Sequence, residues 1–539
     1  MKRKIYYFSL CILMVSFLEA CHMIDVPVTT KLTPDVFPQD SLQFIQSAGT
    51  SYAALRGNYA LDYWFMQTLS TDEAILPARG GNWYDNQNYL MLHYHSWTPD
   101  HPWTASCWSW LSRIIGTTNQ ALAILKESIP ANASYKNSTI AELRMVRALS
   151  YFMMMDLYGN IPLDTLYGDF TPHPTTPRAQ VFNFIESEIN TVLPYLSEDT
   201  GPVMYGRCNK YMAYALLAKM YLNAEVYTGT ARTNDCIAAC DKIISSNKYF
   251  IEPMSSYLRM FYPENGPQMK EFIFAIPFDP AATPLSGTNG YMYRARYEIP
   301  RSERAKFGMP YNPAGAESTL PEFYAHFDDP NDVRNKQWLT GPQYMNDGVT
   351  PILSTPLTPK EYDEKSTDTS SVKRTYQVVL TPEVILRRSV AAFDCGNDEI
   401  SWNMGYRNTK FYPDASSVTR NQNNDMPVFR YSDIILMKAE AILRGGSPTL
   451  GHTAPSLVKM VRDNRSTSAS WDDVSLEQLY EERCREFVAE TWHRNDMIRF
   501  GKYEGQWGYK TNAETYRRIF PVPTNAKVLN TTLTQNPGY

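Results

Sequence analysis

Apolar residues recur at helical spacing through most of the first half of the chain. In residues 108–126, Leu111, Ile114 and Leu122 fall on one face of a helix. Residues 139–158 are apolar on nearly every side, which indicates a helix buried all round, and the following Gly-Asn-Ile-Pro sequence is typical of a helix end. The same pattern predicts further helices over residues 41–60, 209–227, 233–246, 431–444, 454–464 and 476–500.

One predicted helix carries a seam of small and aromatic residues. Tyr211, Ala215, Ala218 and Leu222 follow one another at spacings of four, three and four. Alanines in such a seam let a neighbouring helix approach closely. Together with the short helix that follows, the seam predicts a helix pair like a tetratricopeptide unit, which buries its open face by stacking on the next. Because the chain has no clean repeat of that length, we expect degenerate and interrupted units.

The composition changes between residues 263 and 428, where Gly, Pro, Asn and Tyr prevail and apolar strings are short, as at 272–277 and 376–380. Ordered loops of this length usually carry function. We therefore predict a mainly α fold, in which a tetratricopeptide-like scaffold of helix pairs supports long irregular loops and a few short strands. The predicted organisation is a signal peptide at 1–20, an N-terminal helical region at 21–262, and a C-terminal region at 263–539 with a loop-rich insertion and closing helices.

The N-terminus has the pattern of an export signal. Three basic residues at 2–4 precede a mostly apolar stretch at 5–18, which is too short to span a bilayer and suits a signal peptide. The stretch ends in Leu-Glu-Ala-Cys, which resembles the site where bacterial lipoproteins are cleaved and acylated on the cysteine. We expect lipidation of Cys21; the alternative is an ordinary cleaved signal. No apolar run elsewhere is long enough for a membrane-spanning helix.

Charge and composition narrow the class of ligand. The chain has 51 basic and 56 acidic residues, a net charge of −5, which argues against a nucleic-acid binder held by phosphate contacts. Its aromatic residues are led by 37 Tyr, the side chain that combines a flat apolar ring with a polar end. This composition suits a protein that binds an uncharged ligand. The six cysteines outside the signal and Cys21 lack zinc spacing, and we expect buried free thiols.

Several motifs occur in one order along the whole chain. They are Asp-Val-Pro at 25–27, the helix and turn at 141–163, and the segments 218–224, 430–441, 482–501, 521–523 and 535–539. In this order they resemble the SusD/RagB family of outer-membrane lipoproteins. The resemblance implies a helical scaffold without catalytic activity, anchored at the cell surface by its N-terminal lipid alone. It also implies an oligosaccharide ligand and a SusC-like TonB-dependent transporter as partner, over which the lipoprotein acts as a hinged lid.

A sugar ring is bound by flat aromatic surfaces for its C–H faces and by polar side chains for its hydroxyls. The loop at 77–86 offers both, with Arg79 before a pair of glycines and Trp83, Asp85 and Asn86 after it, and the resemblance places part of the binding surface there. Trp83 is the first candidate; the alternative is that it packs inward. The family's other aromatic positions correspond loosely to Tyr291, Tyr293 and Tyr311, with Trp338 and Trp402 in reserve. The tryptophans in apolar periodic chain, expected in the core, are Trp97, Trp103, Trp108 and Trp110.

Other chemistry is disfavoured. Glu486 and Glu490 lie one helical turn apart, but a glycosidase brings its two carboxylates from opposite sides of a cleft. His93 and His95 have no third ligand at a metal spacing, and the acidic turn at 328–332 lacks the glycine and distal glutamate of a calcium loop. We expect no catalysis, metal or cofactor. An exported glycoside hydrolase, or a helical adaptor that binds peptide or protein, remains the alternative.

Overall fold

The structure is a computed structural model, and it describes residues 37–128, 133–279, 292–418 and 420–539. The predicted signal peptide, Cys21 and Tyr291 lie outside the described residues. The described chain is mainly helical with three short strand pairs, which confirms the predicted fold class. Over these ranges, no helix has the length and apolar character needed to cross a membrane.

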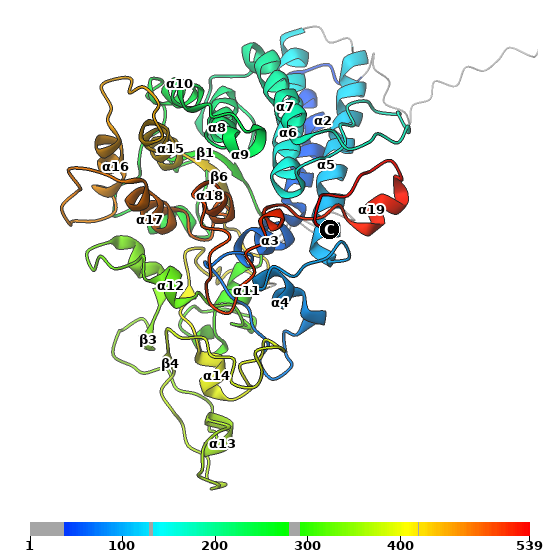
Figure 1. Cartoon of the computed structure of the whole chain (residues 1–539). Helices are drawn as coiled ribbons and strands as arrows, with labels where there is room; N and C mark the ends of the chain where they lie inside the picture. The colour runs from blue at the N-terminus through cyan, green and yellow to red at the C-terminus, as the bar shows by residue number, and fades with distance from the viewer. Residues whose placement is uncertain (1–36, 129–132, 280–291, 419) are drawn as a thin grey trace, which may run out of the picture.

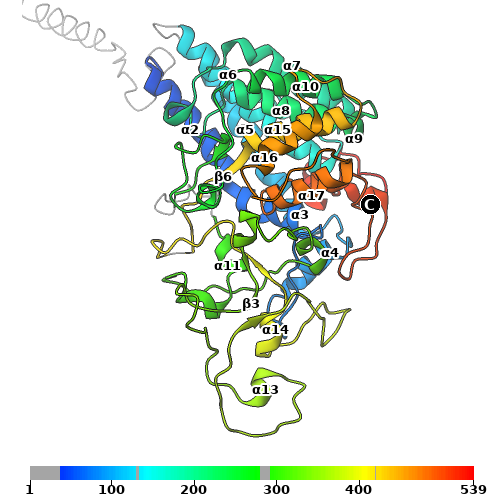
Figure 2. The same cartoon turned by 90° about the vertical axis from the view of Figure 1, so that its left-hand side faces the viewer.

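Stacked helices form the upper half of the molecule in Figures 1 and 2. Helix α2 (Ser41–Asn58) packs on α5 (Pro102–Glu127), which packs on α6 (Ala133–Tyr158), and α6 packs on α7 (Arg178–Val192). Asp40 begins α2 by accepting a hydrogen bond from the backbone of Gln43, as helix caps do. These neighbours in sequence are therefore also neighbours in space, as tetratricopeptide-like stacking requires.

The stack continues with helices from both halves of the chain. Helix α8 (Lys210–Leu222) packs on α10 (Thr233–Ile244), α10 packs on α15 (Tyr431–Leu443), and α15 packs on α16 (Ala454–Arg462). Helix α8 is buried on nearly every side, because α10 and α15 both contact it. The predicted continuation of α8 is instead a separate helix, α9 (Ala224–Thr228), since Asn223 leaves the helical conformation.

The prediction of a single C-terminal helix is wrong. Helix α17 (Leu476–Phe487) ends, and α18 (His493–Arg499) begins after five intervening residues. Between them Ala489 has a φ of 65°, a left-handed conformation that a helix cannot contain. Glu490 is thereby turned inward, where it accepts a hydrogen bond from Nζ of Lys410 at 2.6 Å. A tertiary contact thus overrides the local helical pattern.

The loop-rich region is an insertion closed at its base by two strands. Strand β1 (Phe272–Ile276) pairs antiparallel with β6 (Met426–Arg430), and both strands are fully buried. The chain therefore leaves the helical body at β1 and returns beside the same point at β6. In Figures 1 and 2 the insertion projects below the helices, with α13 (Pro359–Tyr362) near its far end. Its two inner pairs are β2 (Trp338–Leu339) with β5 (Arg407–Asn408), and β3 (Gly341–Pro342) with β4 (Val379–Leu380).

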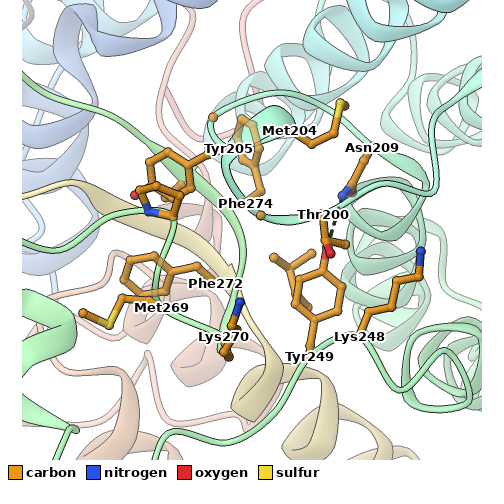
Figure 3. Close-up of a pocket in the computed structure, with 15 residues that line it drawn as sticks. Thr200, Met204, Tyr205, Asn209, Lys248, Tyr249, Met269, Lys270, Phe272 and Phe274 are labelled. Carbon is orange, nitrogen blue, oxygen red and sulfur yellow. Dashed lines mark hydrogen bonds between the residues drawn. The ribbon is translucent and has the colours of Figure 1, made fainter.

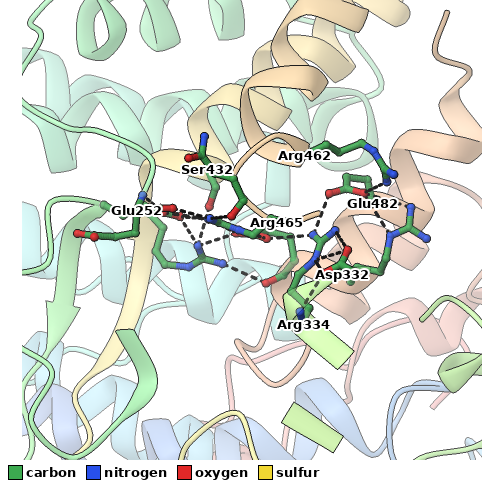
Figure 4. Close-up of polar contacts among 12 residues, drawn as sticks. Glu252, Asp332, Arg334, Ser432, Arg462, Arg465 and Glu482 are labelled. Atoms are coloured by element: carbon green, nitrogen blue, oxygen red, sulfur yellow. Dashed lines mark hydrogen bonds and ion pairs between the residues drawn. The ribbon is translucent and has the colours of Figure 1, made fainter. Parts of the chain in front are cut away.

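A buried network of arginines and carboxylates ties the insertion to the C-terminal helices (Figure 4). Glu486 accepts hydrogen bonds from Arg430 at 2.8 Å, from Arg465 at 3.0 Å and from Arg334 at 3.1 Å. Glu271 bonds Arg465 as well, at 3.0 Å. All five side chains are buried, so removing one partner would leave an uncompensated charge in the interior.

One hydrophobic cluster extends from Ala54 to Leu533 and so joins the helical body to parts of the insertion. The tryptophans expected in the core are buried there, except Trp103, which is half-buried and packs against it. The cysteines in the described residues are all buried and free, which confirms the prediction of buried thiols. They are Cys107, Cys208, Cys236, Cys240, Cys395 and Cys484.

Candidate functional site

The loop that carries Trp83 has an unusual backbone. It lies between α3 (Trp64–Thr68) and α4 (Asn88–His93). The left-handed region contains Trp83 at φ 64°, Asp85 at 40° and Asn86 at 54°, besides Gly80, Gly81 and Gln87. Non-glycine residues adopt this conformation at a cost, and such strain is concentrated at functional sites. The loop is therefore held in shape by its surroundings and not by local preference.

Aromatic side chains support the indole of Trp83 from below. Its ring lies 5.5 Å from the ring of Tyr297 and 6.2 Å from that of Tyr89, both edge-on, and the guanidinium of Arg296 lies 5.7 Å from its centroid. Phe65 continues the cluster inward, 5.0 Å from Tyr297. Trp83 is half-buried. It is thus a fixed ring at the edge of the core, neither enclosed in the interior nor free in solvent.

Arg79 is not a surface group, and its predicted role as a ligand-binding residue is wrong. The side chain is fully buried and donates to the carbonyl oxygens of Ser401, Ala316 and Met404. The next backbone amide, at Gly80, donates to Asp394 at 2.8 Å. Arg79 therefore anchors the Trp83 loop to the insertion. The loop's position depends on contacts more than 300 residues away in sequence.

The other candidates fall into three groups. Asp85 and Asn86 are exposed in the same loop as Trp83. Tyr293 is half-buried and immediately precedes α11 (Arg294–Glu298), the helix that also supplies Arg296 and Tyr297 to the Trp83 cluster. Tyr311 is buried in a separate apolar cluster with Phe307 and Leu380, so its predicted role at an open surface is wrong. Trp338 is buried as well.

A cavity of about 410 Å³ lies near the aromatic cluster around Trp83. It is lined by Arg301, by Ala314 and Gly315, by residues 353–355 of the projecting insertion, and by Trp402. The amides of Ala314 and Gly315, which line the cavity, both donate to the carbonyl of Arg296, at 2.8 and 3.3 Å, so this wall of the cavity is bonded to α11, the helix that also contacts Trp83. The volume falls in the range of small-ligand sites.

Trp402 repeats the arrangement seen at Trp83. The guanidinium of Arg301 lies 5.5 Å from its ring centroid, and its indole N–H donates to Asn397 at 3.1 Å. Asn397 in turn packs closely against Gly80, where a Cβ would come within 2.3 Å of the Asn397 Cβ. The Trp402 segment therefore adjoins the Trp83 loop, and the two tryptophans belong to a region built from the Trp83 loop, α11 and the insertion. We call it the Trp83–Trp402 surface.

Few acidic groups line the cavity of this surface. Among the described residues that line the cavity, Glu399 is the only carboxylate, and burial raises its pKa while a hydrogen bond from Asn403 opposes the rise. Hydrolysis of a glycoside uses two carboxylates across the bond. Glu486 and Glu490 do not supply them, because both are buried in ion pairs with arginine or lysine.

The two histidines set aside as metal ligands are packed as neutral rings. Burial lowers the pKa of His93 to about 3 and that of His95 far below its usual value. His93 lies against Phe393, whereas His95 bonds the carbonyl of Ser70 at 2.8 Å. Over the described residues, no group of three or more His, Cys, Asp or Glu side chains is arranged to hold a metal ion.

A further cavity, shown in Figure 3, is too small for an organic ligand. It lies between residues 200–209 and strand β1 and measures about 40 Å³, which is room for a water molecule or two. Asn209 donates to the hydroxyl of Tyr249 across it at 3.1 Å.

Sequence reasoning missed Arg296, Tyr297 and Arg301 and gave Trp402 only a reserve place. The first two directly follow the predicted Tyr293 segment, but their sequence neighbours give no sign of which side chains meet Trp83. Residues 353–355 carry no aromatic or charged signal at all. Only the folded insertion brings them to the cavity.

Fold and site together define a tetratricopeptide-like helical scaffold that presents a loop-built aromatic surface. The chain belongs to the SusD family, whose profile matches residues 215–539. A second family profile, described as starch-binding and associating with the outer membrane, matches residues 7–222.

Individual relatives agree with this assignment. The chain is 24% identical to the starch-binding protein SusD of Bacteroides thetaiotaomicron, over 87% of its own length and 84% of the relative. Surface glycan-binding protein A of the same organism, solved in complex with laminarihexaose, superposes with a TM-score of 0.68 at 19% identity. The superposition covers 93% of this chain and 100% of that protein's chain. Its counterpart from Bacteroides fluxus gives a TM-score of 0.69 at 16% identity, with the same coverage. These structural similarities show a shared fold.

Proposed function

We propose that this protein binds an oligosaccharide at the Trp83–Trp402 surface without cleaving it. The observation that carries the proposal is a pair of half-buried tryptophans, each beside an arginine: Trp402 lines the cavity of about 410 Å³, and Trp83 lies on the neighbouring loop. Flat rings suit the C–H faces of sugar rings, and the exposed Asp85 and Asn86 suit hydroxyl groups. The starch-binding and laminarihexaose-bound relatives support a glycan as the ligand class.

The test is a binding assay on a glycan panel with matched tryptophan variants. Trp83→Ala and Trp402→Ala should each weaken glycan binding in calorimetry by roughly 5- to 150-fold, if a stacked sugar contributes about 1–3 kcal/mol as a stacked nucleobase does. The control is Trp471→Ala, because Trp471 is also half-buried beside an arginine, Arg462 at 4.0 Å, but lies outside the surface. Its affinity should match wild type.

Unchanged affinity in both Trp83→Ala and Trp402→Ala would refute the site. Time-dependent shortening of any glycan in the panel would refute the absence of catalysis and favour the glycoside hydrolase. A wild-type chain that binds peptides and no glycan would instead identify a helical adaptor of the same fold.

We further propose that the mature protein is anchored in the outer membrane through a lipid on Cys21 and presents its binding surface outside the cell. A SusC-like TonB-dependent transporter is the proposed partner. The outer-membrane association of the matched family and the signal-like sequence before Cys21 support this assignment. Cys21→Ser should release the protein into the soluble periplasmic fraction, whereas continued recovery with the outer membrane would count against the lipid anchor.

A further inference from the structure

A second cavity, of about 380 Å³, opens on the helical scaffold, between α5, α6 and the segment that joins α6 to α7. Its floor is the α5 face made of Ser112, Gly116 and Gln120. A Cβ at Gly116 would meet nothing within 4 Å, so packing does not require glycine there. Glycine inside a helix costs about 1 kcal/mol relative to alanine. The effect of this residue is to keep the floor of the cavity open.

The wall of the cavity presents aromatic rings to solvent. Tyr167 is 58% exposed and Phe170 is 92% exposed, although both line the cavity, and the neighbouring Leu166 is also exposed. The segment that carries them projects outward on the right-hand side of Figure 1. Contiguous apolar groups exposed on a folded protein mark contact sites.

Buried polar side chains hold this wall in place. Asn119 of α5 and Tyr151 of α6 both donate to the carbonyl oxygen of Asp164, at 2.8 and 2.7 Å, and Arg147 donates to that of Thr165 at 3.1 Å. The three donors are almost fully buried. The segment is therefore fixed to the helices beneath it at Asp164 and Thr165, three and two residues before Tyr167. Preorganisation of this kind lowers the cost of binding.

Polar groups complete the lining. Gln120 donates to the hydroxyl of Tyr167 at 3.2 Å, which leaves its amide oxygen to accept, and Ser112, Thr117 and Asp169 surround the same space. A concave site with rings on one wall and hydroxyl, amide and carboxylate groups around it suits a sugar ring. A protein partner would instead need a much larger surface, about 800 Å² on each side.

We propose that this cavity is a second carbohydrate site, at which a sugar ring of a polysaccharide lies against Tyr167 and Phe170. The inference rests on the proposed glycan-binding function and extends it. Trp103, near the start of α5, stacks on Phe65 beneath the Trp83–Trp402 surface. Gly116 follows thirteen residues later, or about 20 Å along the helix. A polysaccharide can occupy both sites, whereas a trisaccharide is too short, so the second site raises the affinity for polymers by multivalency.

The test compares polymers with short ligands. Binding of laminarin, starch, laminaritriose and maltotriose is measured for wild type, Phe170→Ala and Gly116→Gln. The second variant fills the cavity floor while improving helix propensity, so it separates loss of the site from loss of stability. Phe250→Ala is the matched control, because Phe250 is an exposed phenylalanine outside the cavity.

We expect both cavity variants to bind the polymer about tenfold more weakly than wild type, with unchanged affinity for the trisaccharide. The melting temperature should stay at the wild-type value in Phe170→Ala, and should stay there or rise in Gly116→Gln. Phe250→Ala should behave as wild type in every assay. Unchanged polymer affinity in both variants overturns the second site and leaves the exposed rings to a protein contact. A wild-type chain that binds neither polymer nor trisaccharide overturns the proposed function together with this inference, whereas polymer binding lost only in Trp83→Ala overturns the second site alone.

Discussion

Replacing Glu486 by glutamine tests the structural role of the buried ion network. Glu486 is fully buried and accepts from Arg334, Arg430 and Arg465, so glutamine removes a negative charge that all three guanidiniums share. Removing one partner of a buried ion pair costs about 3–5 kcal/mol. With an unfolding entropy of roughly 2 cal/mol/K per residue, a chain of this size should melt about 3–5 °C lower.

The assay is urea unfolding and calorimetry of Glu486→Gln beside Glu477→Gln. Glu477 lies on the same helix, but its side chain is 59% exposed and pairs with Lys502 at 2.8 Å. Its replacement should change stability by less than about 1 kcal/mol. Equal losses in the two variants would refute the reasoning, because burial would then make no difference to the ion pair.

The acid limb gives an independent measurement on the same variant. Burial alone would raise the pKa of Glu486, but the guanidiniums of Arg465, Arg430 and Arg334 outweigh it and hold the pKa well below its usual 4.5. A depressed pKa contributes stability that is present above about pH 4.5 and is lost as the pH falls further. Wild type should therefore lose stability more steeply than Glu486→Gln on acidification, and parallel curves would contradict the assignment.

Two further predictions concern the insertion and the Trp83 loop. Burial raises the pKa of Glu303 to about 7, so its contribution is complete below pH 4.5 and is lost as the pH rises through 7. Glu303→Gln should match wild type in urea unfolding at pH 4.5 and exceed it by up to about 3 kcal/mol at pH 8, whereas an equal difference at both pH values would contradict this assignment. Because Trp83 has a φ of 64°, Trp83→Gly should be more stable than Trp83→Ala by about 0.5–1 kcal/mol, with the same loss of glycan binding. A less stable glycine variant would count against loop strain.

The helical scaffold could be predicted from sequence because its signals are local. Periodic apolar residues located both ends of α15, and one end of each of α5, α6 and α8, to within one residue. The break between α17 and α18 could not be predicted, because the left-handed Ala489 is held by a hydrogen bond from its own amide to Glu73, more than 400 residues away.

The candidate site could be predicted only in part, because some of its signals are local and others depend on remote contacts. A glycine-rich loop with Trp83, Asp85 and Asn86 is visible in sequence, and the structure keeps these three at or near the surface. Arg79 lies in the same loop and is also a polar side chain that could bind a ligand. It is buried instead, because it donates hydrogen bonds to the carbonyl oxygens of Ser401 and Ala316. Nothing near position 79 or near Tyr311 indicates which remote backbone or side chains will cover them.

The same geometry explains how one scaffold can serve different ligands. The Trp83–Trp402 surface is assembled from loops that meet only in three dimensions, whereas the helices beneath are fixed by apolar stacking and by the ion network around Glu486. Substitutions in residues 353–355 can therefore reshape the cavity without disturbing a buried ion pair. Solved structures at 16% and 19% identity share the fold at TM-scores of 0.69 and 0.68. A relative at 24% identity aligns over 87% of this chain. Ligand specificity in this chain should accordingly depend on the insertion, and exchanging its loops between relatives should transfer specificity while leaving the melting temperature of the helical body nearly unchanged.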